Sequence, residues 1–302
     1  MPGKVFISCG QRDDEERAVA GQIADWFSSR GFDPYVAIQT QSFQDVTGGI
    51  IGNLRAADFY VFVDCRRELV PVDKCGQAQY RGSLFTNQEL AIALALGLDN
   101  AVFVQQEGVL LEGMAKYLLA NARKFDILAE VPEMIKQEVN ARKWSPQYSR
   151  HLVVAKLRDP FDLPPEQPQR RHWEVDIENR RPDKAAVNAT ARLIKIESPD
   201  RTWDSPDPSD LKWAKQPGFS RTIRPNGFET VDVLFQDLRN PGDFHLISAI
   251  DVFPKKPVLS AARGIHRLRY DVYSEGFPPL EFVLQLNATG DLSTTVDLAE
   301  NA

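Results

Sequence analysis

The sequence predicts an α/β domain with a parallel sheet, followed by an all-β sandwich domain. Three observations lead to this prediction. The 302 residues exceed the usual size of one domain, so two domains are expected. Up to about residue 149, short β-rich runs alternate with helical ones, which is typical of a parallel sheet covered by helices. After residue 170, short alternating runs follow one another with no helical pattern between them.

The first domain, residues 1–150, is expected to open with a buried strand, KVFIS, at residues 4–8. The next segment begins with acids, which suit a helix N-terminus, and repeats apolar residues at helical spacing before it ends at Gly31. A second strand is expected at residues 33–38, followed by a loop and a short helix. The third strand, FYVFVDC, is expected at residues 59–65.

The remainder of the first domain is expected to alternate in the same way. The run LAIALALG favours a helix by propensity, and AVFVQQ at residues 101–106 predicts the next strand. Residues 113–125 and 132–144 are both expected to be helices that form the outer layers.

A proline-rich stretch marks the boundary, so residues 151–170 are expected to be a linker. The second domain, residues 171–302, then shows a rhythm of about seven short strands, which points to an immunoglobulin-like antiparallel sandwich. A Cys-Trp-Cys pattern is absent, so this prediction depends on the number of strands. The clearest runs are residues 172–179, 189–198, 230–237, 244–253, 265–274 and 280–286.

Composition excludes several classes of protein. The net charge of −6 argues against a protein that coats nucleic acid. The start of the chain lacks a basic-then-apolar signal region, and the longest apolar run is less than half a membrane span, so we expect a cytoplasmic protein that does not enter a membrane. Neither the three cysteines nor the four histidines have the spacing of metal ligands, so no metal site is expected.

Three segments of the first domain carry a family resemblance. KVFISCGQRDDEE, DVTGGIIGNLRAADFYVFVD and GSLFTNQELAIAL occur in an order that resembles the TIR domain, in particular bacterial TIR domains of anti-phage defence systems. The resemblance covers roughly the first 125 to 150 residues. It implies a flavodoxin-like α/β fold and, in enzymatic members, cleavage of the bond between nicotinamide and ribose in NAD+. NAD+ is then the substrate, and no separate cofactor is expected.

The resemblance also implies roles for particular residues. Glu89 matches the glutamate that enzymatic members need for catalysis. Phe85 lies where the family often has tryptophan, and the run SCG at residues 8–10 departs from the commoner serine–tyrosine–serine. Phe43 is expected to stack on nicotinamide, to insert into a neighbouring copy, or to fold back on its own core. The implied substrate-binding residues are Ser8, Cys9, Gly10, Gln11, Ser42, Phe43, Ser83 and Phe85.

A carboxylate suits this reaction for a physical reason. Nicotinamide is bonded to ribose through its ring nitrogen, which carries a positive charge. Breaking that bond moves the charge to the sugar, which becomes oxocarbenium-like, and a nearby carboxylate stabilises it. In a partly closed pocket the low dielectric strengthens the attraction between the carboxylate and the developing positive charge. Backbone amides of residues 8–11, helped by the start of the following helix, are candidates for contact with the diphosphate, and Gly10 would allow close approach.

Other interpretations remain open. TNQE has the form of a capping box, with Thr86 as N-cap and Glu89 as the residue that reaches back. The chain could also be a TIR adaptor that only assembles with other TIR domains. A third candidate is an enzyme similar to nucleoside deoxyribosyltransferases, which also place a glutamate beside a sugar. We expect self-assembly through the first domain, and a protein or small-molecule trigger at the sandwich.

Overall fold

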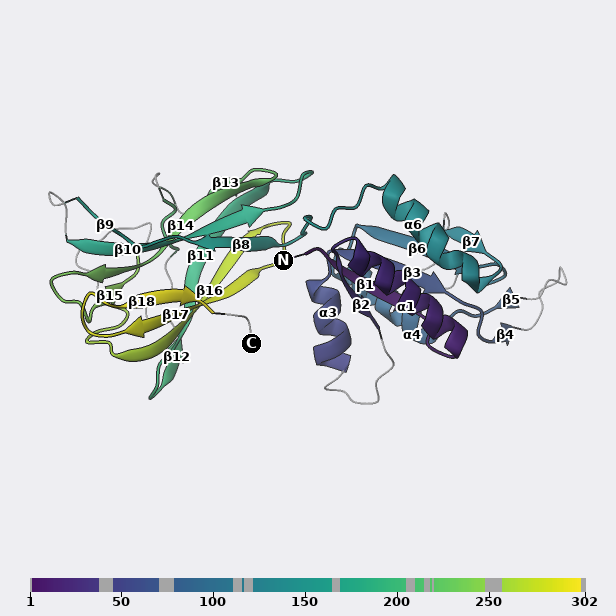
Figure 1. Ribbon diagram of the computed structural model, residues 1–302, viewed down its shortest axis with the longest axis horizontal. Coiled ribbons are helices and arrows are strands. Elements are labelled where there is room, and N and C mark those ends of the chain that lie inside the picture. Colours follow the sequence, from purple (N-terminus) through teal and green to yellow (C-terminus); the bar gives the residue numbers. More distant parts are fainter. Residues whose placement is uncertain are drawn as a thin grey trace. The chain divides into compact units, whose positions relative to one another are not determined.

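The computed structural model describes residues 2–37, 46–70, 79–110, 116, 122–164, 169–204, 210–214, 218, 220–247 and 257–299. The chain divides into two compact units, Met1–Tyr148 and Ser149–Ala302, and each is described by itself (Figure 1). Within the described ranges, none of the helices is long and apolar enough to cross a membrane.

The first unit is built on a five-stranded parallel sheet with the order β2-β1-β3-β6-β7 (Figure 1). All six residues of β3 are buried, because helices cover both faces of the sheet. The strands are β1 (Lys4–Cys9), β2 (Asp33–Val36), β3 (Phe59–Asp64), β6 (Ala101–Gln106) and β7 (Arg123–Phe125).

Helices and short turns connect these strands. Asp13 caps the first helix by accepting a hydrogen bond from the backbone N–H of Glu16, as expected for an acid-rich helix start. A small antiparallel pair, β4 (Leu69–Val70) and β5 (Gln79–Tyr80), follows β3. The helices are α1 (Asp14–Ser29), η1 (Val46–Ile51, π-helical), α3 (Gly52–Ala56), α4 (Leu84–Ala95), η2 (Leu128–Glu130, a 3-10 turn) and α6 (Val131–Ala141).

Alternation along the strands separates two hydrophobic clusters, one on each face of the sheet. Val5, Ile7 and Cys9 of β1 pack with α1 and α6. Phe6 of β1 packs instead with Tyr60 and other residues of β3 and with the inner faces of α3 and α4. Ser8 follows Phe6 in the alternation and therefore faces α4.

The second unit contains two antiparallel sheets that enclose one core. The first has the order β15-β14-β10-β8 with β9 beside β10, and the second has the order β12-β11-β16-β17-β18 with β13 beside β11. Both Trp173 and Trp213 are almost completely buried in this core. The strands are β8 (Leu152–Leu157), β9 (Phe161–Asp162), β10 (Arg170–Asn179), β11 (Ala186–Glu197), β12 (Thr202–Asp204), β13 (Arg221–Ile223), β14 (Gly227–Asp237), β15 (Phe244–His245), β16 (Gly264–Glu275), β17 (Leu280–Ala288) and β18 (Thr295–Leu298).

The predicted fold class is therefore confirmed: a parallel α/β sheet with helices precedes antiparallel sheets packed like a sandwich. Two segments differ from expectation. The end of the helix expected at residues 113–125 is instead β7, whose Phe125 is buried against the sheet, so tertiary pairing outweighs helix propensity there. Residues 151–170, expected to be a linker, contain β8 and β9, which both pair with β10.

Candidate active site

The first turn of α4 shows that Glu89 is not part of a capping box. The N-cap is Ser83, whose extended backbone precedes the helix and whose hydroxyl accepts a 3.5 Å hydrogen bond from the Thr86 backbone N–H. Thr86 already lies inside the helix and donates its hydroxyl to the Ser83 carbonyl at 3.1 Å. The alternative in which Thr86 is the N-cap is therefore wrong, because the N-cap is Ser83, three residues earlier. The Glu89 carboxyl lies beyond the first turn.

Glu89 instead points toward the sheet. Ser8 near the end of β1 donates its hydroxyl to Glu89 Oε2 at 2.5 Å, which joins two residues 81 positions apart in the chain. Ser8 is completely buried, and Glu89 is 8% exposed. The pair lies next to the point where the chain order of the sheet reverses, since β2 and β3 flank β1 on opposite sides. In open α/β sheets, ligands commonly bind beyond the strand ends at such a point.

Burial raises the pKa of Glu89 to about 7, and the hydrogen bond from Ser8 opposes this rise. The carboxyl group thus exchanges its proton near neutral pH. Carboxyl groups with strongly raised pKa values are common in functional sites.

Two tyrosines lie within the electrostatic reach of Glu89. Burial raises the pKa of Tyr35 on β2, and the charge of Glu89 adds to that rise. Burial also raises the pKa of Tyr60 on β3 well above its ordinary value, against the effect of Ser8, and Glu89 again contributes to the rise. The carboxyl group therefore lies among aromatic side chains and hydroxyls.

Leu84 and Phe85 form an apolar surface at the start of α4. Leu84 is 69% exposed and Phe85 is 56% exposed, so two consecutive large apolar side chains are open to solvent. Phe85 lies four residues before Glu89, so the two side chains share one helix face. The predicted substrate-binding residue Phe85 is thus accessible one turn away from the carboxyl group.

Asp64 and Gly82 fix the position at which α4 begins. A Cβ atom at Gly82 would overlap the Asp64 carboxylate, so the main chain passes close to that side chain. Gln105 donates to Asp64 Oδ2 at 3.0 Å from the neighbouring strand. Burial raises the pKa of Asp64, against hydrogen bonds from Gln105 and the Ser83 backbone. The end of β3 is therefore connected to the cap of the helix that carries Glu89.

The loop after β1 is already occupied by an acid from the protein itself. Glu16 of α1 accepts a hydrogen bond from the Arg12 backbone N–H at 2.7 Å and forms an ion pair with Arg67. A Cβ atom at Gly10 would overlap both Glu16 and Arg67. In this structure, the absence of a side chain at Gly10 makes room for that ion pair.

The other predicted binding residues are distributed differently. Cys9 packs on the α1 face, opposite to the face of Ser8, and burial raises its pKa to about 12. The Gln11 carbonyl accepts a 3.0 Å hydrogen bond from the side chain of Arg17. Ser42 and Phe43 lie outside the described residues. Of the predicted residues, Ser8 is the one that the structure shows in contact with Glu89. Ser83 is the N-cap of the helix that carries Glu89, and Phe85 lies one turn before Glu89 on it.

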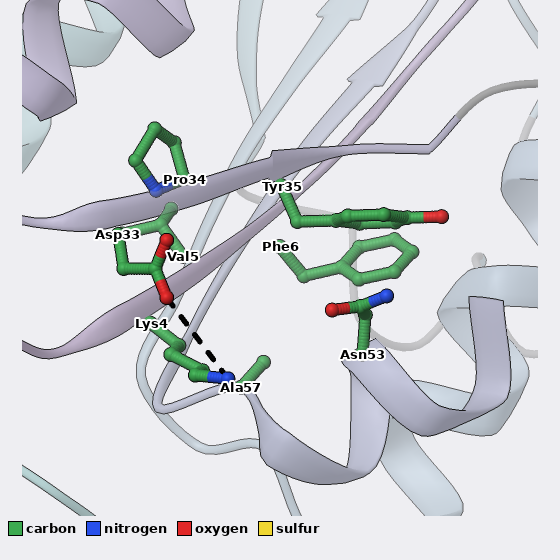
Figure 2. A pocket seen from close by; sticks show the side chains of 8 residues that line it. All are labelled: Lys4, Val5, Phe6, Asp33, Pro34, Tyr35, Asn53 and Ala57. Atoms are coloured by element: carbon green, nitrogen blue, oxygen red, sulfur yellow. Dashed lines mark ion pairs between the residues drawn. The ribbon is translucent and has the colours of Figure 1, made fainter. Parts of the chain in front are cut away.

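A small cavity opens between β1, β2 and α3 (Figure 2). The Tyr35 and Phe6 rings are in tilted contact, with a centroid separation of 5.3 Å. Figure 2 shows the Tyr35 hydroxyl directed away from the ion pair of Lys4 and Asp33. A second, more open hollow lies beyond the carboxyl ends of the strands, between Arg12 and Asp126. Glu89 lines neither of these two hollows, which are formed by described residues.

Three residues have no counterpart among the predicted site residues: Tyr35 and Tyr60, on which the charge of Glu89 acts, and Asp64, which contacts the start of α4. Tyr60 could have been found from the sequence, because it and Ser8 occupy the same side of two neighbouring strands once β1 and β3 are paired in parallel. The contact of Asp64 with the start of α4 gives no sequence signal, since it depends on the path of residues between β3 and α4.

No protein-family model matches the sequence, and no curated protein matches it. Among solved structures, CapF in complex with the inhibitor 3-isopropenyl-tropolone has a TM-score of 0.26 at 7% identity, with 76% of this chain and 91% of CapF covered. The β-glucosidase from Listeria innocua in complex with gluconolactone has a TM-score of 0.25 at 12% identity, and 95% of this chain covers 46% of that enzyme. Similarities this weak carry no argument about family or function.

Proposed function

We propose that the first unit is an NAD+ nucleosidase that cleaves the bond between nicotinamide and ribose, with Glu89 as its catalytic carboxylate. The observation that supports the proposal most is the buried hydrogen bond from Ser8 to Glu89. The bond directs the carboxyl group toward the sheet and away from the helix cap. Burial at that position raises the pKa of Glu89 to about 7, and the bond opposes the rise. The ordered TIR-like segments supply the choice of substrate, and bacterial defence against phage is the proposed context.

In the proposed reaction the C–N bond breaks and its electron pair stays on nicotinamide, which leaves as a neutral ring. The positive charge moves to the ribose, where the ionised Glu89 carboxylate stabilises it. Attack by water then gives ADP-ribose and a proton, whereas attack by a nitrogen of the adenine ring gives a cyclic product. The cationic nicotinamide ring of bound NAD+ would itself favour the ionised form of Glu89, because opposite charges lower the pKa of a carboxyl group.

The test uses the purified full chain and measures release of nicotinamide from NAD+ by chromatography. Glu89→Gln should lower the rate roughly 10²-fold or more, since it removes the charge that stabilises the transition state. Glu107→Gln is the matched control, because Glu107 belongs to the same unit and is exposed. Wild-type turnover by Glu89→Gln would overturn the proposal.

Two other outcomes identify the alternatives. If the wild-type chain releases no nicotinamide over a range of protein concentrations but still self-associates, the adaptor role is favoured. If it instead exchanges the base of a deoxynucleoside, the chain acts like a nucleoside deoxyribosyltransferase, where a carboxylate also faces the anomeric carbon. The proposed cytoplasmic location and a regulatory role of the second unit are independent of this choice.

A further inference from the structure

The hydroxyl of Tyr60 is a buried polar group that lacks a well-formed hydrogen bond. Tyr60 is 1% exposed, and its hydroxyl oxygen has no hydrogen-bond partner among the described residues. An unsatisfied buried polar group costs free energy, so most such groups in folded proteins have a partner or a function. Phenylalanine would fill the same space in this apolar cluster without that cost.

The position of Tyr60 connects it to the candidate active site. β1 and β3 are parallel, with Phe6 opposite Tyr60 and Ser8 opposite Phe62, so these four side chains share one face of the sheet. The Tyr60 ring stacks on Phe6 with a centroid separation of 5.9 Å. In this register Ser8 and Tyr60 are diagonal neighbours on that face. In agreement with this placement, Ser8 lowers the pKa of the Tyr60 hydroxyl, against the larger effect of burial.

Counting donors and acceptors shows what the two hydroxyls can do together. A serine hydroxyl has one proton to donate and two lone pairs that accept. Ser8 uses its proton in the 2.5 Å bond to Glu89 Oε2, so its oxygen can still accept. The Tyr60 hydroxyl has a proton to donate and no acceptor in a well-formed bond.

We propose that Tyr60 is a positioning residue that donates its hydroxyl proton to Ser8 Oγ when Glu89 is ionised, completing a chain of hydrogen bonds from Tyr60 through Ser8 to Glu89. Each O–H group in such a chain polarises the next one, which strengthens the bond to the final acceptor. Tyr60 is too deeply buried to meet substrate, so it would act only through Ser8. The chain would hold the carboxylate in one orientation and favour its ionised form.

The other titratable groups near Glu89 do not supply this effect. Tyr35 lies on β2 within the electrostatic reach of Glu89, and Cys9 lies on the opposite face of β1. Burial raises the pKa of each, so both are neutral near pH 7. The charge of Asp64 at the end of β3 raises the pKa of the Tyr60 hydroxyl, but Asp64 donates no hydrogen bond to Glu89. The Tyr60 hydroxyl is therefore the side-chain donor that the described residues place behind Ser8.

The test is a titration of Glu89 in the full chain without substrate. Glutamate labelled with ¹³C at the side-chain carboxyl carbon is incorporated, and the Glu89 signal is assigned by its loss in Glu89→Gln. Tyr60→Phe keeps the ring and should raise the pKa of Glu89 by roughly 0.1 to 0.6 pH unit, if one bond in the chain adds 10–30% to a charged hydrogen bond. Tyr270→Phe is the matched control, because Tyr270 is a buried tyrosine of the second unit.

The Ser8→Ala background shows whether the effect passes through Ser8. The shift caused by Tyr60→Phe should disappear in that background, and a shift that persists would overturn the proposed chain. An unchanged Glu89 titration in Tyr60→Phe would also overturn it. Because no substrate is used, these results do not depend on NAD+ cleavage. Only one consequence rests on the proposed function: the low-pH limb of kcat/KM should move upward by the same amount.

Discussion

Replacing Glu89 by glutamine should produce a protein that is inactive and yet more stable above neutral pH. Glutamine has nearly the same shape, so the substitution mainly removes a charge from a side chain that is 8% exposed. Burial raises the pKa of Glu89 from 4.5 to about 7. When Glu89 is ionised, a rise of this size lowers the free energy of unfolding by about 3 kcal/mol.

The sign of the pH dependence follows from the same values. The folded protein holds the Glu89 proton more tightly than the unfolded chain does, so this residue favours folding most below pH 4.5. That contribution falls as the pH rises and is lost above about pH 7. The glutamine variant has no proton to lose, so its advantage over the wild type should be small at pH 5 and largest at pH 8.

Urea unfolding at pH 5 and pH 8, followed by tryptophan fluorescence, measures this difference. Trp26 and Trp144 report on the first unit, where Glu89 lies, and Glu107→Gln again serves as the exposed control. The expected gain for Glu89→Gln at pH 8 is at most about 3 kcal/mol, because water penetration and relaxation reduce the effect of burial. An equal stability change at both pH values would refute the inference that Glu89 is a buried carboxyl group with a raised pKa.

Three further predictions concern the frame of the site and its control. Gly82→Ala should lower the free energy of unfolding by roughly 1–3 kcal/mol and reduce nicotinamide release, because the added carbon overlaps Asp64. Gly21→Ala in α1, where a Cβ meets nothing within 4 Å, should be neutral or stabilising. Equal stability of the two variants would contradict this prediction. Nicotinamide release should rise more steeply than protein concentration if copies assemble, and full specific activity at high dilution would exclude that requirement. Deleting residues 149–302, the second compact unit, should leave a folded first unit with altered control, so unchanged activity and partner binding would contradict a regulatory role.

Much of the first unit could be predicted from the sequence because its strands are short, apolar and bounded by turns. β1, β3 and β6 lie where they were expected. β7 was missed, because a three-residue edge strand is specified by its pairing with β6 and carries no pattern of its own. The alternating residues of β8 were hidden by the neighbouring prolines, and its pairing with β10 is a long-range contact.

The site was predicted less completely for a related reason. The choice of Glu89 as the candidate catalytic residue followed from the resemblance to TIR domains, but its partner Ser8 had been assigned to substrate instead. The capping box failed because Ser83, three residues before Thr86, is an equally good cap that follows a glycine. At Ser83 the chain also passes close to Asp64 through Gly82, and local sequence does not encode that long-range contact.

The most direct test of the central claim is the pH dependence of kcat/KM for nicotinamide release from NAD+. This quantity reports the ionisation of the free enzyme. If the ionised Glu89 carboxylate stabilises the developing charge on ribose, kcat/KM should rise tenfold per pH unit at low pH and become constant above a bend near pH 7, where the pKa of Glu89 lies. A rate that does not change between pH 5 and pH 9, or that falls as Glu89 ionises, would contradict the proposed role.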